Sequence, residues 1–180
     1  MAFDPGAKNL GVWAGRSPEL TEKLGRFDIK AGGRPAYEAV TELLRSNPWM
    51  SDPALVAEAV VETQAPRNVP ARIIAVAIYS FLRGMGVPVR FSGAHMKDAA
   101  MKRCSQRCSV PLLPKPPAGS KASARYRVNK KNSVAVAGPL LGPKVVSMFG
   151  RKLDDVCDAA LLGVGLCMQK EVEEEEAKRK

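Results

Sequence analysis

Four acidic residues lie at positions that hydrophobic patterning alone would not assign to acids. Asp4 follows a short apolar start and Glu62 ends an apolar run, while Asp155 and Asp158 are three apart on a predicted helix and share one of its faces. Two carboxylates about 4 Å apart repel by about 4 kcal/mol at an effective dielectric of about 20, so a cluster needs a compensating cation or raised pKa values. Mg²⁺ prefers such oxygen ligands, and two ions can activate water and stabilise the leaving oxygen in phosphodiester hydrolysis. The four acids therefore predict a metal-dependent hydrolytic site.

Each of these acids also has a purely structural explanation. An Asp before Pro-Gly is often a turn residue, and Glu62 could be a surface group at the end of a strand. Asp154 or Asp155 could be a helix N-terminal charge that the helix dipole favours. The acids taken singly leave both explanations open.

The positive charge of the chain is concentrated in one segment. The formal net charge is +10, and between Lys97 and Lys131 ten basic residues stand against the single acid Asp98. Concentrated positive charge favours a polyanionic partner, because neutralising phosphates releases condensed counterions. A solvated basic face is the alternative on charge alone. Together with the four acids, the basic segment predicts a nuclease.

Length and composition limit the class of protein. The 180 residues fit one domain, and 46% hydrophobic with 26% charged residues is typical of a soluble globular protein, which excludes wholesale disorder. No apolar run approaches the roughly 18 to 20 residues of a membrane span, and no basic signal peptide opens the chain, so we expect an intracellular protein with no membrane partner. Four cysteines are too few for a disulfide scaffold, which favours reduced thiols in a reducing compartment.

Hydrophobic periodicity predicts an α/β domain. Three early strands, a strand ending at Glu62 and a strand at residues 87–91 alternate with helices at 35–44 and 70–83. Residues 110–123 are rich in proline and predict a loop, and helices follow at 129–140 and 153–169. Residues 171–180 are charged without apolar positions and predict a frayed tail. The helix at 70–83 is apolar almost all round, so it could hold a dimer or belong to the core of the monomer.

Four segments in order along the chain carry a family resemblance. They are residues 3–9 (FDPGAKN), 62–67 (ETQAPR), 129–134 (NKKNSV) and 151–158 (RKLDDVCD). Together they resemble the RuvC-like Holliday-junction resolvases of the ribonuclease H-like superfamily, and most closely the branch found in poxviruses and related large DNA viruses.

The resemblance implies a fold and an activity. The fold is α/β, a ribonuclease H-like mixed central sheet flanked by helices, over residues 1–170, with a basic proline-rich insertion around 97–127 and a charged C-terminal tail at 171–180. The activity is that of a Holliday-junction resolvase, a Mg²⁺-dependent endodeoxyribonuclease that cuts four-way and other branched DNA during recombination or viral genome processing. Two Mg²⁺ ions per site are implied, with Mn²⁺ as a substitute, and a homodimer that matches the approximate two-fold symmetry of the junction.

The resemblance also implies roles for individual residues. The implied catalytic residues are Asp4, Glu62, Lys130, Lys131, Asp155 and Asp158. The four acids bind the metal ions, one of the two lysines faces the scissile phosphate, and Asp154 caps the helix. The expected DNA contacts are Gln64, Arg67, Lys115, Lys121, Arg125 and Arg127, the last four in a basic stretch that is either a DNA-contacting loop or a plain insertion.

Two features depart from the family pattern. Only three residues precede Asp4, although it should end a strand of about five residues, so either that strand is short or the natural start lies upstream. The stretch from Lys97 to Arg125 is also longer than the family leads us to expect.

Other readings of the sequence remain. A non-catalytic nucleic-acid-binding module with structural acids would fit the same charges. A phosphotransferase of the actin-like and sugar-kinase superfold would need two lobes, for which 180 residues leave no room. A zinc site at His95, Cys104 and Cys108 lacks a fourth ligand, although structural zinc is usually four-coordinate.

Overall fold

The computed structural model describes residues 1–17, 20–29 and 34–179. Within them the chain forms a five-stranded mixed sheet with the strand order β3-β2-β1-β4-β5. The strands are β1 (Ala2–Pro5), β2 (Asn9–Ser17), β3 (Leu20–Asp28), β4 (Ala59–Glu62) and β5 (Val89–Ser92).

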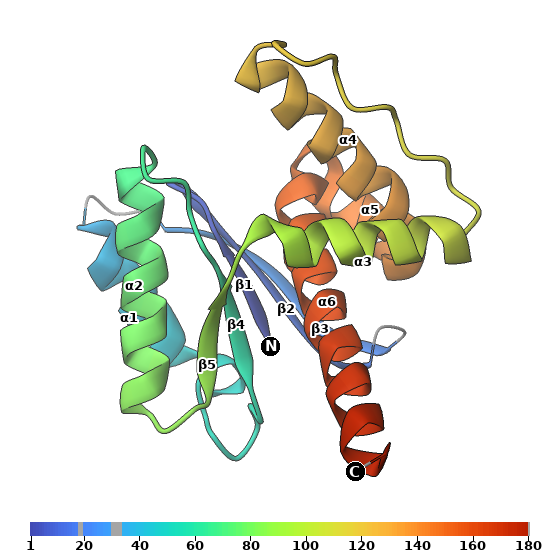
Figure 1. Ribbon diagram of the computed structural model, residues 1–180. Coiled ribbons are helices and arrows are strands. Elements are labelled where there is room, and N and C mark those ends of the chain that lie inside the picture. The colour runs from blue at the N-terminus through green and yellow to red at the C-terminus, as the bar shows by residue number, and fades with distance from the viewer. Residues whose placement is uncertain (18–19, 30–33, 180) are drawn as a thin grey trace.

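Six α-helices are described around this sheet. They are α1 (Ala36–Ser46), α2 (Val69–Gly84), α3 (Ala94–Arg107), α4 (Ala122–Leu141), α5 (Pro143–Phe149) and α6 (Leu153–Arg179), with 3-10 turns at Pro48–Met50 and Gly150–Lys152. Figure 1 shows α1 and α2 on one side of the sheet, and α3, α4 and α6 on the other. None of the described helices is long and apolar enough to cross a membrane.

The strand directions confirm the predicted fold class. β1, β2 and β3 form an antiparallel meander, while β4 pairs parallel to β1 and β5 pairs parallel to β4. A meander on one side of the first strand and parallel strands on the other is the ribonuclease H-like arrangement. The short first strand of this chain keeps its place at the centre, because Phe3 pairs with Val12 on one side and Val61 on the other.

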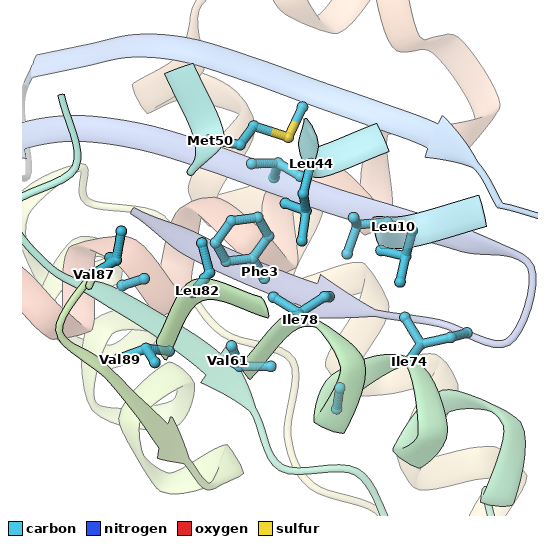
Figure 2. Close-up of a cluster of buried hydrophobic side chains, with 14 of the residues drawn as sticks. Phe3, Leu10, Leu44, Met50, Val61, Ile74, Ile78, Leu82, Val87 and Val89 are labelled. Atoms are coloured by element: carbon cyan, nitrogen blue, oxygen red, sulfur yellow. The ribbon is translucent and has the colours of Figure 1, made fainter. Parts of the chain in front are cut away.

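Alternate residues of the central strands serve two different cores. Phe3 and Val61 pack toward α1 and α2, in the cluster drawn in Figure 2. Ala2 and Val60 pack against α6 on the opposite face. Each fully buried Leu, Ile or Phe side chain contributes about 1.5–3 kcal/mol, so this two-sided burial fixes the strand register. Since side chains alternate along a strand, the residues that follow Phe3 and Val61 turn back toward α6.

Glycine allows α6 to lie close to the sheet. A Cβ atom on Gly11 of β2 would meet the backbone carbonyl of Asp155, and one on Gly163 of α6 would meet the ring of Trp13. These two close approaches hold the first three turns of α6 directly against β2.

Three segments differ from the expectations of the sequence. Residues 94–107 form α3, and α4 begins at Ala122 rather than near 129, so the basic stretch is two helices joined by a loop. The charged residues beyond 170 continue α6 to Arg179 instead of fraying. This last prediction was wrong because Glu, Lys and Arg are good helix formers and because Glu171 pairs with Arg103 on α3 at 3.1 Å.

Candidate active site

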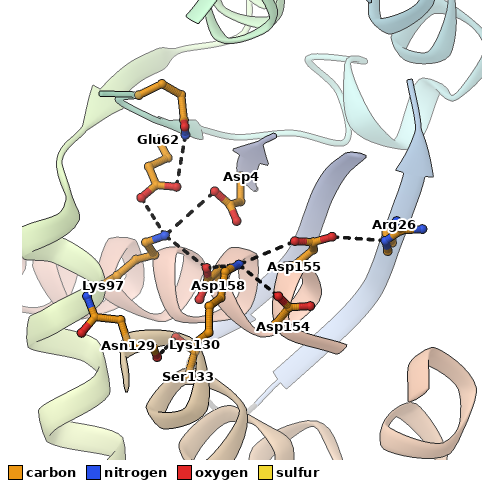
Figure 3. Close-up of polar contacts among 11 residues, drawn as sticks. Asp4, Arg26, Glu62, Lys97, Asn129, Lys130, Ser133, Asp154, Asp155 and Asp158 are labelled. Carbon is orange, nitrogen blue, oxygen red and sulfur yellow. Dashed lines mark hydrogen bonds and ion pairs between the residues drawn. The ribbon is translucent and has the colours of Figure 1, made fainter. Parts of the chain in front are cut away.

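The ends of two neighbouring parallel strands bring the first two acids together. Asp4 lies near the end of β1 and Glu62 ends β4, each one residue beyond the paired residues Phe3 and Val61. Asp158, which lies in the second turn of α6, faces them across a cleft of about 540 Å³. Figure 3 shows these three carboxylates directed toward one another.

Lys97 of α3 lies among these three carboxylates. Its Nζ is 2.6 Å from Glu62 Oε1, 3.6 Å from Asp158 Oδ2 and 3.9 Å from Asp4 Oδ1. The Lys97 side chain is only 14% exposed. Three acids from three different elements therefore converge on a single positive charge.

Lys130 of α4 forms a second bridge on the other side of Asp158. Its Nζ donates a hydrogen bond of 2.7 Å to Asp158 Oδ2 and lies 3.5 Å from Asp154 and 3.6 Å from Asp155. Lys131, the next residue, is exposed and does not line the cleft. Of the two lysines predicted for the site, the structure brings only Lys130 to it.

Asp155 occupies a different environment from Asp158. Arg26 of β3 donates to Asp155 Oδ2 at 3.2 Å, and the Arg26 side chain is largely buried. The carboxylate of Asp155 lines the same cleft as Asp4, Glu62 and Asp158. It is held at the edge of the cluster, between Arg26 and Lys130.

Burial and neighbouring charges set the ionisation of the cluster. Burial raises the pKa of Asp4 well above its usual range, Lys97 opposes that shift, and the carboxylates of Glu62 and Asp158 add to it. Burial also acts to raise the pKa of Glu62 and Asp158, but it is outweighed. A hydrogen bond with Asp4 and the charge of Lys97 hold the pKa of Glu62 below its usual value. Lys97 and Lys130 do the same for the pKa of Asp158.

The two lysines remain charged in this site. Burial alone would lower the pKa of Lys97 and of Lys130, yet the surrounding carboxylates raise both above the ordinary lysine value. The cluster thus accommodates its negative charge by two ammonium groups and by a proton that Asp4 retains more readily than an ordinary Asp.

The remaining predicted residues lie around the cleft. Gln64 lines it and donates a hydrogen bond of 3.3 Å to Glu62 Oε2, whereas Arg67 is exposed outside it. The other predicted DNA contacts are exposed on the loop after α3 and on the first turns of α4: Lys115, Lys121, Arg125 and Arg127.

Three residues at the site were not assigned to it from the sequence. Lys97 was grouped with a basic insertion, although Met96, Ala100 and Cys104 around it have helical spacing and are buried. Arg26 carries no local signal, because its role depends on contact with α6. Tyr126 lines the cleft with 61% of its surface exposed, one helical turn before Lys130.

The donor set fits a divalent cation, although the ammonium groups now stand between the carboxylates. Within residues 1–17, 20–29 and 34–179, no three acidic, histidine or cysteine side chains are grouped closely enough to hold a metal ion as they stand. The acids of the cluster and its rim are Asp4, Glu62, Asp154, Asp155 and Asp158, and the basic groups that face them are Lys97, Lys130 and Arg26. Carboxylate oxygens of this kind are the ligands that a hard divalent ion such as Mg²⁺ prefers.

The chain is similar in structure to known proteins, but no protein-family model matches it and no curated protein sequence matches it significantly. Among solved structures, T. thermophilus RuvC in complex with a Holliday junction substrate matches with a TM-score of 0.40 and 16% sequence identity. The match covers 82% of this chain and 94% of the RuvC chain. The assignment of this chain to the ribonuclease H-like fold rests on its own strand order and directions.

Proposed function

We propose that this protein is a Holliday-junction resolvase, a metal-dependent endonuclease that hydrolyses phosphodiesters in four-way and other branched DNA. The observation that carries the proposal is the convergence of Asp4, Glu62 and Asp158 on one cation position, at the C-terminal ends of two parallel strands. A hard-oxygen cluster of this kind beside an exposed basic surface suits a polyanionic substrate. The sequence segments that resemble RuvC-like resolvases contain all three of these acids.

Mg²⁺ is the proposed cofactor, with Mn²⁺ as a substitute and two ions per site. Asp4, Glu62 and Asp158 would hold one ion, and Asp155 at the edge of the cluster would share the second. When bound, the ions supply Lewis acidity and lower the pKa of a water molecule. The protein contributes the fixed carboxylates and a cleft that admits a phosphodiester.

The basic residues of the chain position the DNA. Lys130 is anchored by Asp158 at the cleft, where its charge can neutralise the phosphate group that is cut. Gln64 and the exposed Tyr126 border the same cleft. The exposed basic residues from Lys115 to Arg127 provide contacts to phosphates farther along the DNA arms.

A homodimer is supported by an apolar strip on α2. Ala71, Ile74 and Ile78 on one face of this helix are in the core, whereas Val69 and Ile73 on another face are 53% and 49% exposed. With Val76, 55% exposed, they form a row at the spacing of successive helical turns. Two copies joined through this strip would match the two-fold symmetry of a four-way junction. Sedimentation equilibrium, which measures the association of the chains, tests this contact by comparing Ile73→Glu with the unchanged protein.

The setting we propose is an intracellular, reducing compartment. The four cysteines, Cys104, Cys108, Cys157 and Cys167, form no disulfide among the residues that the structure describes. The resemblance of the four segments to the poxvirus branch supports a role at the site of viral DNA replication in the host cell.

A non-catalytic DNA-binding module is the second candidate, and one observation favours it. The lysines already pair with the acids, so the cluster could be a salt-bridge network that supports a basic binding surface. In that case DNA binding would be indifferent to the acids and no cleavage would occur.

The decisive experiment is a cleavage assay on a labelled four-way junction. With Mg²⁺ or Mn²⁺ we expect paired nicks in the junction, none with EDTA, and little cutting of a linear duplex of the same sequence. Asp158→Asn, which removes a charge and almost no volume, should lower the single-turnover rate by about a thousandfold or more and leave junction binding intact. Tight junction binding without cleavage under any metal condition would instead establish the binding module.

A further inference from the structure

The ammonium of Lys97 occupies the point on which the carboxylates converge. Its contacts with Glu62, Asp158 and Asp4 lie between 2.6 and 3.9 Å, which is the environment expected of a bound cation. Figure 3 shows the side chain entering from α3 and ending between these acids. Lys130, by contrast, lies to one side of Asp158 and does not contact Glu62 in the described structure.

We propose that Lys97 is the internal counter-ion of the metal site, and that a divalent cation binds by displacing its ammonium group. This inference rests on the proposed metal-dependent nuclease. Lys97 acts through the carboxylates that it holds together, so it is a positioning residue. The predicted metal ligands and the place where the ammonium now lies are the same small region of the cleft.

The charges of the site favour such an exchange. Lys97 supplies one positive charge to Asp4, Glu62 and Asp158, and Lys130 supplies a second to Asp158 alone. A divalent cation at the position of the Lys97 ammonium would supply twice the charge of that ammonium to the same oxygens. An ammonium group has only three N–H donors for the carboxylates around it. A divalent metal ion can be coordinated by the oxygens of several carboxylates at once. The metal-bound arrangement therefore stabilises more of the negative charge than the lysine does.

The architecture of α3 permits the ammonium to leave without unfolding the helix. Met96, Ala100, Met101 and Cys104 are buried and fix the backbone on either side of Lys97. The four-carbon stem of lysine has several rotatable bonds, so its charged end can move while its Cα stays in place. The cleft beside it, lined also by Tyr126 and Asn129, is open to solvent.

Two consequences distinguish this counter-ion from an ordinary ion pair. Without metal, Lys97 keeps three neighbouring carboxylates from repelling one another, so its loss destabilises the metal-free protein. With metal, Lys97 competes for the same oxygens, so its loss increases metal affinity. An ordinary stabilising contact would give the first effect without the second.

The test is equilibrium Mn²⁺ binding to the full chain without DNA, followed by the electron paramagnetic resonance signal of free Mn²⁺. Lys97→Met should bind Mn²⁺ about tenfold or more tightly than the unchanged protein, because a positive charge next to the ligands is removed. Lys97→Arg, which keeps the charge, should bind with nearly unchanged affinity. Lys102→Met is the matched control, since Lys102 is an exposed lysine on the same helix outside the cleft.

Thermal unfolding supplies a second measurement. In EDTA, Lys97→Met should melt below the unchanged protein, and saturating Mn²⁺ should remove the difference or reverse it. Equal or weaker Mn²⁺ binding by Lys97→Met overturns the inference, and so does a variant that stays unfolded at every Mn²⁺ concentration, because the metal then cannot replace the ammonium. If neither the unchanged protein nor Lys97→Met binds Mn²⁺, the proposed metal-dependent nuclease itself fails.

Discussion

Lys130 and Lys131 are adjacent in the sequence but differ in their surroundings. Lys130 donates to Asp158 at the cleft, whereas Lys131 points to solvent. A cation beside the scissile phosphate stabilises charge that develops in the transition state, while a solvent-facing lysine contributes to binding alone.

Replacing these two lysines singly should therefore have different kinetic effects. Lys130→Ala should slow single-turnover junction cleavage by about a hundredfold and weaken junction binding much less. Lys131→Ala should change the rate by less than about threefold. The measurements are single-turnover rates at saturating protein and junction affinity in Ca²⁺; equal losses of rate for the two variants would contradict a special role for Lys130.

The ionisation of Asp4 predicts a pH dependence that shifts with metal concentration. Burial raises the pKa of Asp4, so this carboxyl retains its proton at a pH where an ordinary Asp has lost it. A metal ion binds only the carboxylate and competes with that proton. In a plot of cleavage rate against pH, raising the Mg²⁺ concentration about tenfold should therefore move the rising part of the curve to lower pH. The shift should be up to about one pH unit for one competing proton. A limb that stays at the same pH at both concentrations would show that no such proton competes.

The same carboxyl groups determine how the stability of the metal-free protein changes with pH. The raised pKa of Asp4 means that its contribution to the free energy of unfolding is fully present below its ordinary pKa and is lost as the pH rises through the raised value. Glu62 and Asp158 have lowered pKa values, so their contributions are present above their ordinary pKa values and are lost as the pH falls.

At the scale of elements, the site depends on how closely α6 approaches β2. Gly11 permits this approach, because a Cβ there would meet the backbone carbonyl of Asp155 and lie 3.3 Å from the Cβ of Ala159. A backbone carbonyl cannot rotate away as a flexible side chain can. Any side chain at position 11 therefore moves the first turns of α6, and with them Asp155 and Asp158.

Gly11→Ala tests this dependence. We expect the free energy of unfolding to fall by about 1–3 kcal/mol, as for other overpacked sites, and junction cleavage to fall with it at a temperature where the variant is still folded. Gly84→Ala is the matched control, since a Cβ there has nothing within 4 Å and the residue ends α2 on the other side of the sheet. Urea denaturation and cleavage rates measure both effects; a Gly11→Ala protein with unchanged stability and rate would show that α6 adjusts without cost.

At the scale of the whole molecule, positive charge extends from the cleft across α4 and the loop before it. Lys115, Lys121 and Arg125 are exposed there, and Figure 1 shows this region extending away from the sheet. Contacts to phosphates release counterions, so their number appears as the slope of binding against salt concentration. They position the protein without reading sequence.

Replacing these three residues with Ala should weaken binding to four-way junction and duplex alike. The log-log slope of affinity against salt should flatten by roughly one unit per lost contact, measured between about 50 and 200 mM salt. Arg83→Ala on α2, an exposed basic residue on the opposite side of the sheet, should leave the slope unchanged. An unchanged slope for the triple variant would show that these residues do not contact DNA. The DNA-binding surface would then have to be sought around Arg67 and Arg72.

Much of the fold could be predicted from the sequence, because its signals are local. Alternation of apolar residues marks the central strands, and the acids at Asp4 and Glu62 fall where those strands end. The three-residue spacing of Asp155 and Asp158 puts them on one helix face. Local periodicity does not predict α3, where basic residues separate four buried apolar positions. At the end of α6 the charged residues predict a frayed tail, but they continue the helix.

Which residues meet at the site is known only from the tertiary structure. The roles of the predicted catalytic residues stay predictions, but the structure selects Lys130 over Lys131 and adds Lys97 and Arg26 to the cluster. Arg26 and Asp155 are 129 positions apart, and no periodicity links residues at that distance. Which charges meet is decided by the packing of α3, α4 and α6 on one face of the sheet. The position of each acid can thus be predicted from the local sequence. Which basic residue pairs with it cannot, because a buried carboxylate needs a partner from whichever element packs beside it, and only the tertiary structure determines that element.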